Sequence, residues 1–275
     1  MSHFSNLRDG ELTELKRIMG EFFTAEQGRK INQNPGIMKA MFDTAMLDPV
    51  FRLIHGIWSP LDDVVAMARE YEGVTGDMID IMLAKARDRG LFELFEAELP
   101  KSRLLAPVIV SNRESVPATL LFGRALMRTA HSEKYSEWDA AYANGVDDKR
   151  IKLIEGARTF VPNELALHIV DFGANWNRRD GTVLAEVQQK QIGHLADFEP
   201  LFAASQHPEW VRQMDGEKIP YAIMAALLLS VPDYDEWSLS PGVWRGGGRA
   251  ELSGDYVDCR FYERAMPVRR EPNKL

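Results

Sequence analysis

Helix starts marked by a capping residue and a proline constrain this chain more than any other sequence feature. Such a pair occurs three times in the first 60 residues, as Asn34-Pro35, Asp48-Pro49 and Ser59-Pro60. The side-chain oxygen accepts hydrogen bonds from the unpaired N–H groups of the first turn, and a proline at the first helical position gives up an N–H that has no partner anyway. Each pair therefore predicts a helix start, so that short helices follow one another closely.

The spacing of apolar residues supports this interpretation. An apolar stripe runs from Leu61 to Tyr71 and ends at Gly73, and a second helix is expected between a Thr75 cap and Gly90. Further helices are predicted at residues 117–130, 137–143, 148–158, 164–176, 182–202 and 220–230. The sequence thus predicts a mainly α fold, an irregular multi-helix bundle of short capped helices with a small C-terminal β-hairpin.

Proline and glycine divide the chain into three regions. Residues 1–100 form an N-terminal helical region, and residues 101–240 form a helical core region. Where these two meet, the apolar run 104–110 contains a proline, which is typical of an edge strand or an extended linker. Residues 241–275 form a Gly-rich turn and β-hairpin tail, with a strand expected at 256–262. The three regions could also belong to one continuous domain.

The overall charge argues against nucleic acid as the main partner. The formal net charge is −8 and the pI is near 5.4, whereas proteins that bind phosphate backbones usually carry a basic surface. The charge is uneven, because residues 245–275 hold seven Lys and Arg against five Asp and Glu. A net charge of this size gives only a weak field. Nucleic-acid association through the basic tail therefore stays a further alternative, carried by Arg245, Arg249, Arg269 and Arg270.

Cysteine usage and hydropathy indicate a cytoplasmic protein without a membrane partner. The single cysteine, Cys259, cannot form an intramolecular disulfide. The first residues lack the apolar core of a signal peptide. The most apolar run, Tyr221–Val231, is shorter than the roughly 20 residues that span a bilayer, so we expect it to be a buried helix.

Two His-x-x-Asp pairs form the most chemically suggestive pattern. They are His168 with Asp171 and His194 with Asp197, each inside a predicted helix. If the two helix faces opposed each other in a bundle, the four side chains could bind a divalent metal. The stronger interpretation is a solvated face, since Leu165 and its neighbours at helical spacing supply an apolar stripe for the core. We therefore expect no cofactor and keep the metal as an alternative.

A glycine run flanked by arginines is a candidate site for phosphate or another anion. It comprises Arg245, Gly246, Gly247, Gly248 and Arg249. Backbone N–H groups in such a run can cradle a phosphate between guanidinium groups. However, no Lys-Ser/Thr follows the run and no helix start is evident, so it is not a Walker-type loop. A flexible loop before a hairpin is the simpler explanation.

Aromatic residues gather in the loop-rich stretch 205–245 and suggest an interface. The candidates there are Trp210, Tyr234, Trp237 and Trp244. Aromatic side chains anchor many protein interfaces, although packing in the core is the favoured interpretation of such residues. No nucleophile elbow, metalloprotease motif or dinucleotide fingerprint occurs. We therefore expect an interaction or assembly protein that works through protein partners or self-association, with a metal-dependent enzyme as the alternative.

Overall fold

The computed structural model describes residues 57–98, 104–142, 146–147, 149–176, 183–232, 234, 237–256 and 263–272. Residues 56–275 form one compact unit, so the region boundaries expected near residues 100 and 240 fall inside it. The helix starts predicted at Asn34-Pro35 and Asp48-Pro49 lie outside the described residues, as do Cys259 and most of the strand expected at 256–262.

The fold is mixed α/β, and the predicted mainly α bundle is therefore wrong. One sheet, sheet A, is antiparallel in the order β1-β4-β10, with β1 at Leu105–Ser111, β4 at Leu165–Asp171 and β10 at Val268–Arg270. The larger sheet B has the order β2-β8-β7-β5-β9, and β6 pairs with both β3 and β7. The strands of sheet B are β2 (Tyr135–Glu137), β3 (Ile151–Leu153), β5 (Tyr221–Ile223), β6 (Leu227–Leu229), β7 (Leu239–Gly246), β8 (Arg249–Tyr256) and β9 (Arg264–Ala265).

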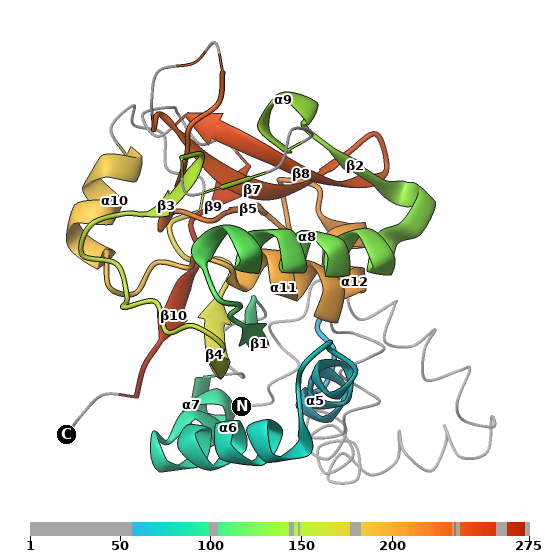
Figure 1. The fold of residues 1–275 in the computed structure, drawn as a ribbon, viewed down its shortest axis with the longest axis vertical. Helices are drawn as coiled ribbons and strands as arrows, with labels where there is room; N and C mark the ends of the chain where they lie inside the picture. Colours follow the sequence, from blue (N-terminus) through green and yellow to red (C-terminus); the bar gives the residue numbers. More distant parts are fainter. Residues whose placement is uncertain are drawn as a thin grey trace, which may run out of the picture. The chain divides into compact units, whose positions relative to one another are not determined.

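Helices separate the two sheets and cover the outer face of sheet A (Figure 1). Helices α8, α11 and α12 lie between the sheets, where α11 packs against both β1 and β7. Helices α5, α6 and α7 pack on the other side of β1 and β4. The helices are α5 (Leu61–Arg69), α6 (Gly76–Asp88), α7 (Leu91–Glu98), α8 (Val116–His131), the 3-10 turn η2 (Ser132–Lys134), α9 (Asp139–Tyr142), α10 (Val183–Gln191), α11 (Glu199–Gln206) and α12 (Pro208–Gln213).

Where the sequence shows a clear cap and an amphipathic stripe, the predicted helices are confirmed. The helices expected at 61–71, 75–89 and 117–130 are α5, α6 and α8. The Thr75 hydroxyl accepts a hydrogen bond from the Met78 N–H, and Gly90 follows α6 with a φ of 69°. Ser59 does not cap α5, because its hydroxyl donates to the Gln206 carbonyl instead.

Predicted helices are wrong where strands are buried on both faces. The stretches 148–158, 164–176 and 220–230 contain β3, β4, and β5 with β6. A strand covered on both faces is a continuous apolar run, and over a few residues its spacing does not differ from that of a buried helix. The helix expected at 182–202 divides into α10 and α11, and the one at 137–143 shortens to α9.

The apolar run with an internal proline is an edge strand, β1. The outward side of its backbone is satisfied by two side chains, one from the last residue of α11 and one from the residue after it. Gln206 accepts from the Ile109 N–H at 3.0 Å and donates to the Ile109 carbonyl at 2.6 Å. The Nε2–H of His207 donates to the Pro107 carbonyl at 2.8 Å. Because alternate residues of an edge strand direct their backbone groups outward, the N–H that Pro107 lacks would have belonged to no ladder.

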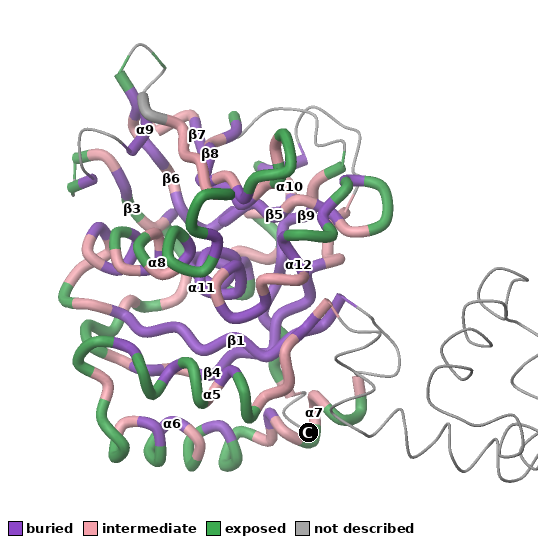
Figure 2. The backbone as a smooth tube through the Cα atoms, turned by 90° about the vertical axis from the view of Figure 1, so that its right-hand side faces the viewer, coloured by how far each residue is buried: buried purple, intermediate pink, exposed green. Residues whose placement is uncertain are grey.

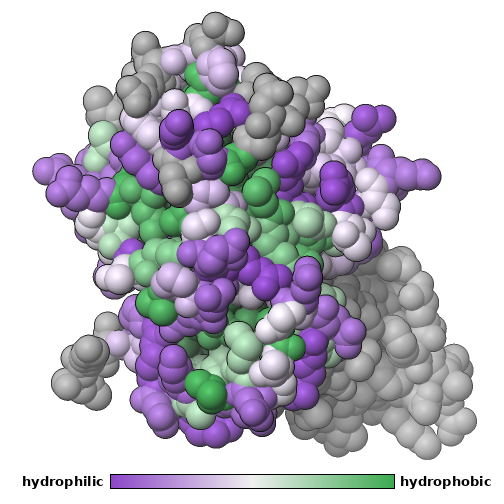
Figure 3. Space-filling view, viewed as in Figure 1, coloured by the Kyte–Doolittle hydropathy of each residue, from purple (hydrophilic) through white to green (hydrophobic). Residues whose placement is uncertain are grey.

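Helix α11 forms the centre of the core. Figure 2 shows β1 as buried along its length, and β4 and α11 are buried at all positions but one each. Gly123 lets α8 approach α11 closely, because a Cβ at this position would lie 2.8 Å from Leu201 Cδ2. The outer side of α8 is partly exposed, with Leu121 at 36%. In the space-filling view of this side, hydrophobic residues form a band across the middle, at the level of α8 in Figure 1 (Figure 3).

The glycine run is the turn of the β7–β8 hairpin. Gly246 pairs with Arg249, so Gly247 and Gly248 are the two residues of the turn, with φ of 56° and 80°. A two-residue turn with positive φ at both positions matches the twist of its strands and requires glycine or asparagine. A hairpin therefore exists in the predicted C-terminal region, with its two strands on either side of the glycines, whereas most of the strand expected at 256–262 lies outside the described residues.

Candidate functional site

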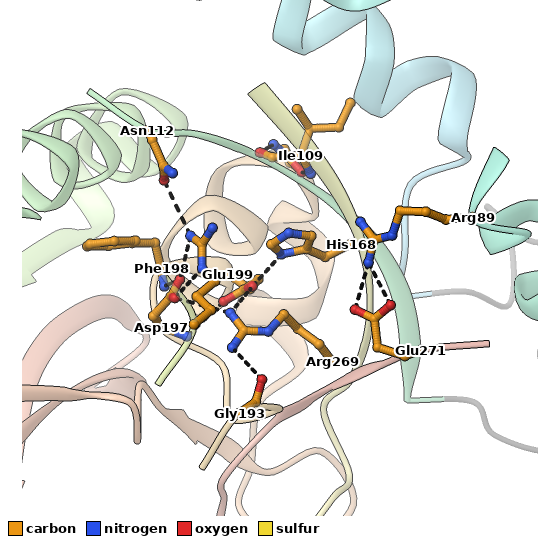
Figure 4. A network of polar contacts seen from close by, with 12 residues as sticks. Arg89, Ile109, Asn112, His168, Gly193, Asp197, Phe198, Glu199, Arg269 and Glu271 are labelled. Atoms are coloured by element: carbon orange, nitrogen blue, oxygen red, sulfur yellow. Dashed lines mark hydrogen bonds and ion pairs between the residues drawn. The ribbon is translucent and has the colours of Figure 1, made fainter. Parts of the chain in front are cut away.

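Five ionisable side chains meet between sheet A and the start of α11. Figure 4 shows four of them with labels: His168, Asp197, Glu199 and Arg269. His168 of β4 and Arg269 of β10 lie on the same face of sheet A, because Arg269 pairs with a residue two positions from His168. Asp197 precedes α11, and Glu199 is its first residue. Arg158 comes from the segment between β3 and β4. We call these residues the ionic cluster.

The cluster is held by charge-assisted hydrogen bonds. Arg158 binds Asp197 in a bidentate manner, with Nε 2.5 Å from Oδ2 and Nη2 3.1 Å from Oδ1. Arg269 Nη1 bridges the two carboxylates, 3.1 Å from Asp197 Oδ2 and 3.2 Å from Glu199 Oε1. The His168 Nδ1 contacts the same oxygen of Glu199. The other oxygen, Oε2, accepts from the Asp197 N–H at 2.8 Å.

The two carboxylates of the cluster are sealed from solvent and paired with cations. The side chains of Asp197 and Glu199 are 0% exposed. Burial alone would raise the pKa of Glu199, but Arg269 and His168 hold it well below its usual value. Two carboxylates face two guanidinium groups, which is the condition under which buried charges are tolerated. We therefore assign the cluster to fastening α11 onto sheet A.

The structure brings together only part of the predicted metal site. His168 and Asp197 both belong to the ionic cluster, and His168 is buried, not solvated as a helical face would require. Asp171 lies on the other face of β4 and pairs with Arg270, while His194 is exposed in the segment after α10. Among the residues that the structure describes, no group of three or more His, Cys, Asp or Glu is arranged to hold a metal ion.

Sequence reasoning missed Arg158, Glu199 and Arg269 as members of this cluster. One usable signal was present, because Asp197 stands just before α11, and Glu199, directly before Pro200, is its first residue. Carboxylates before such a proline indicate a helix start with strong acceptors. The two arginines carry no local signal, since only the fold brings residues 158 and 269 to residue 197.

The glycine-run candidate borders a basic pocket of about 590 Å³ between η2, α12 and the hairpin turn. Arg245 and Gly248 line it, whereas Arg249 is exposed at the turn and is not among the lining residues. Two further cations, Lys134 and Arg212, line the same pocket. Part of the predicted anion-binding motif thus lies beside cations that sequence spacing could not have linked to it.

On sheet B lies an aromatic groove of about 660 Å³. Glu251, Ser253 and Asp255 alternate along β8 and therefore share one face of the sheet, where they form the floor. The aromatic side chains that line the groove come from four separate segments: Trp138, Tyr234, Trp244 and Tyr256. At one end of the groove, the Tyr234 ring contacts two others. Its centroid lies 5.3 Å from that of Trp138 and 5.8 Å from that of Tyr256.

Two glycines of β7 shape the groove beside Trp244. The Trp244 indole lies over Gly242, where a Cβ would be 2.3 Å from its Nε1. The Glu251 carboxylate leans over Gly246, where a Cβ would be 2.5 Å from its Oε2. The pattern Gly-x-Trp-x-Gly therefore leaves room for a large ring and an acid side by side on one strand pair.

Of the three carboxylates that line the groove, one has no counter-charge among the described residues. Glu137 is neutralised by Arg124, and Asp255 by Arg264. Burial alone would raise the pKa of Glu137, but hydrogen bonds from Arg124 and from a neighbouring tyrosine lower it overall. In the part of the chain that the structure describes, no hydrogen bond or ion pair involves the Glu251 carboxylate. The free negative charge of the groove is therefore at Glu251.

The four predicted interface residues lie in different environments. Tyr234 and Trp244 line the aromatic groove, and Tyr234 is 38% exposed. The Lys152 ammonium lies over the Trp237 ring, with Nζ 3.9 Å from the ring centroid. Trp210 is fully buried and packs against Phe172 in the core, so it presents no surface to a partner.

The four arginines proposed for nucleic acid do not form one surface. Arg269 is 5% exposed and belongs to the ionic cluster. Arg270 is engaged by Asp171 at the edge of sheet A, whereas Arg245 and Arg249 lie at the hairpin turn of sheet B. A phosphate backbone could not reach Arg269 without unfolding the cluster.

Comparison with known proteins gives no relative from which to infer function. No family model, no curated protein and no solved structure matches this chain. None of the helices that the structure describes is long and apolar enough to cross a membrane. The function is therefore argued from the geometry of the sites.

Proposed function

We propose that this protein is an interaction protein, and that its aromatic groove binds a cationic segment of a protein partner. The observation that carries the proposal is the unpaired Glu251 carboxylate among the aromatic rings of Trp138, Tyr234, Trp244 and Tyr256. A lysine or arginine side chain combines with such a site in two ways, through its charge and through contact with aromatic faces.

The aromatic rings already accept a cation within the chain. The Arg264 guanidinium lies over the Trp244 ring at 4.2 Å and also pairs with Asp255. One arginine thus combines an aromatic face with a carboxylate on this sheet. We infer that Glu251 and the remaining rings offer the same combination to an arginine or lysine from outside.

The residue types also favour a protein partner. Tyrosine and tryptophan are enriched among the residues that carry most of the binding energy at protein interfaces. Tyr234 and Tyr256 are exposed by 38% and 39%, and both rings have a polar hydroxyl, so they can be partly wet before binding. A metal-dependent enzyme receives less support, because among the described residues no three His, Cys, Asp or Glu side chains are arranged to hold a metal ion.

We further propose a cytoplasmic location. A single cysteine in the sequence is the support, since proteins of oxidising compartments commonly rely on disulfide pairs.

An array of immobilised random dodecapeptides would test the proposed function. We expect the peptides retained by the wild-type protein to be enriched in lysine and arginine. Glu251→Lys should abolish this enrichment, because it replaces by a cation the one groove carboxylate that has no partner among the described residues. Glu72→Lys is the matched control, since it makes the same charge change at an exposed turn after α5. Retention of acidic or neutral peptides, or equal loss in both variants, would refute the proposal.

A further inference from the structure

The basic pocket lies at the other end of the β7–β8 hairpin and is independent of the aromatic groove. Its lining comes from the end of α8 with η2, from α12 and from the hairpin turn. Trp244 lines the groove and Arg245 lines the pocket, because adjacent residues of a strand point to opposite faces. The volume of about 590 Å³ falls in the range of small-molecule sites.

The pocket brings together three cations, two of which have no carboxylate partner among the described residues. Lys134, Arg212 and Arg245 line it, against one lining carboxylate, Glu133. Arg212 pairs with Glu209. Among the described residues, no carboxylate pairs with Lys134 or Arg245, and the contact of Arg245 is with the Met214 carbonyl at 3.4 Å. In a chain with a net charge of −8, such an excess of positive charge stands out from the average surface.

The backbone around the pocket holds the cations in place. Ser132, immediately after α8, has φ 44° and ψ −119°, a conformation that is rare for a residue with a side chain. This sharp change of direction begins the single turn η2 and brings Lys134 to the pocket. On the opposite side, a Cβ at Gly248 would meet nothing within 4 Å, so the backbone of the turn is open to a ligand.

One lining histidine contributes no charge at neutral pH. Burial lowers the pKa of His131, and its Nε2–H donates to the Ala204 carbonyl at 2.9 Å. The positive charge of the pocket is therefore carried by Lys134, Arg212 and Arg245.

We propose that this pocket binds a small phosphate-bearing ligand. Guanidinium groups match phosphate oxygens in pairs, and a lysine ammonium adds a point charge from a third direction. Cations from three separate segments surround one concave volume, which suits a compact ligand with several negative charges. A long polyanion would instead require a stripe of cations along one face.

Titration calorimetry with inorganic pyrophosphate at physiological ionic strength would test this proposal on the full-length protein. We expect saturable binding with one site per chain. The double variant Lys134→Gln with Arg245→Gln should weaken binding at least tenfold, because it removes both unpaired cations. Lys190→Gln is the control, since it removes an exposed cation of α10 that does not line the pocket. Circular dichroism of each variant would establish that it is folded.

Three results would overturn the inference. One is the absence of saturable pyrophosphate binding to the wild-type protein, and another is equal weakening in the double variant and in Lys190→Gln. The third is tight binding of a single-stranded oligonucleotide without binding of pyrophosphate, which would indicate a nucleic-acid surface. None of these results bears on peptide binding by the aromatic groove, so the two proposals stand or fall separately.

Discussion

His207 shows how one buried side chain joins distant parts of the chain. Its Nδ1 accepts from the Ser59 N–H at 2.9 Å, and its Nε2–H donates to the Pro107 carbonyl at 2.8 Å. The contact with Ser59 requires a neutral ring, because a protonated Nδ1 cannot accept a hydrogen bond. Burial lowers the pKa of His207 to about 4.

Acidification should therefore destabilise the protein between pH 6.5 and pH 4. The pKa of a histidine in the unfolded chain is about 6.5, so over this range the unfolded state binds the proton and the folded state does not. The stabilisation is complete above pH 6.5 and is lost as the pH falls to 4, by roughly 3 kcal/mol in total. Urea unfolding as a function of pH would measure it, and His207→Gln should have a flatter profile over this interval. Parallel profiles for the two proteins would exclude His207 as the cause.

The ionic cluster makes an equally specific prediction. Glu199→Gln leaves Arg269 buried with less counter-charge, so we expect the free energy of unfolding to fall by about 3–5 kcal/mol. Asp171→Asn is the control, because its partner Arg270 is 49% exposed and such a pair contributes at most about 1 kcal/mol. Chemical denaturation at neutral pH would compare them. If the free energy of unfolding fell by a similar amount in both variants, burial would not explain the contribution of Glu199 to stability.

At the scale of elements, the contact between the end of α11 and the edge of β1 is the clearest dependency. Gln206 satisfies the N–H and the carbonyl of Ile109 and donates to the Tyr71 hydroxyl at 2.7 Å. The side chain thus takes the place of a neighbouring strand. It also closes an edge that would otherwise be free to pair with another chain.

Replacing Gln206 should lower the stability of the protein, because the edge of β1 loses its hydrogen-bond partner. Gln206→Leu leaves two buried backbone groups of β1 without partners, and we expect a loss of roughly 3 kcal/mol in the free energy of unfolding. Gln213→Leu, at the exposed end of α12, should change it by less than about 0.5 kcal/mol. Hydrogen exchange gives a second measurement, because the Ile109 amide should exchange faster in the first variant alone. An unchanged Ile109 rate would contradict this account of the edge.

The same elements show how far the sequence could be interpreted. Helices with their own caps, such as α6 after Thr75, are predictable because their signals are local. Strand β4 was not, because both of its faces are covered and its run of apolar residues has no alternation. The candidate sites divide similarly. Tyr234, Trp244 and the glycine run were visible as residue types, whereas the pairing of Glu251 with the aromatics depends on strand register.

For the whole molecule, the β7–β8 hairpin is the feature that connects the two proposed sites. One face of the hairpin forms the floor of the aromatic groove, where Glu251 lies. The turn of the hairpin and the opposite face border the basic pocket, where Arg245 lies. The ionic cluster and the Gln206 contact hold the helices beneath the hairpin. On this account the interior fixes the hairpin, and the hairpin presents two surfaces of opposite charge.

The most direct test of whether the aromatic groove binds a cationic segment is the affinity of the protein for a cationic peptide. A lysine- or arginine-rich peptide taken from the array would be titrated into the wild-type protein and into the Glu251→Lys and Glu72→Lys variants, with tryptophan fluorescence as the signal. We expect the Kd for the peptide to rise at least tenfold in Glu251→Lys and to stay within twofold of the wild-type value in Glu72→Lys. A Kd that is unchanged in Glu251→Lys would contradict the assignment of the groove as the binding site.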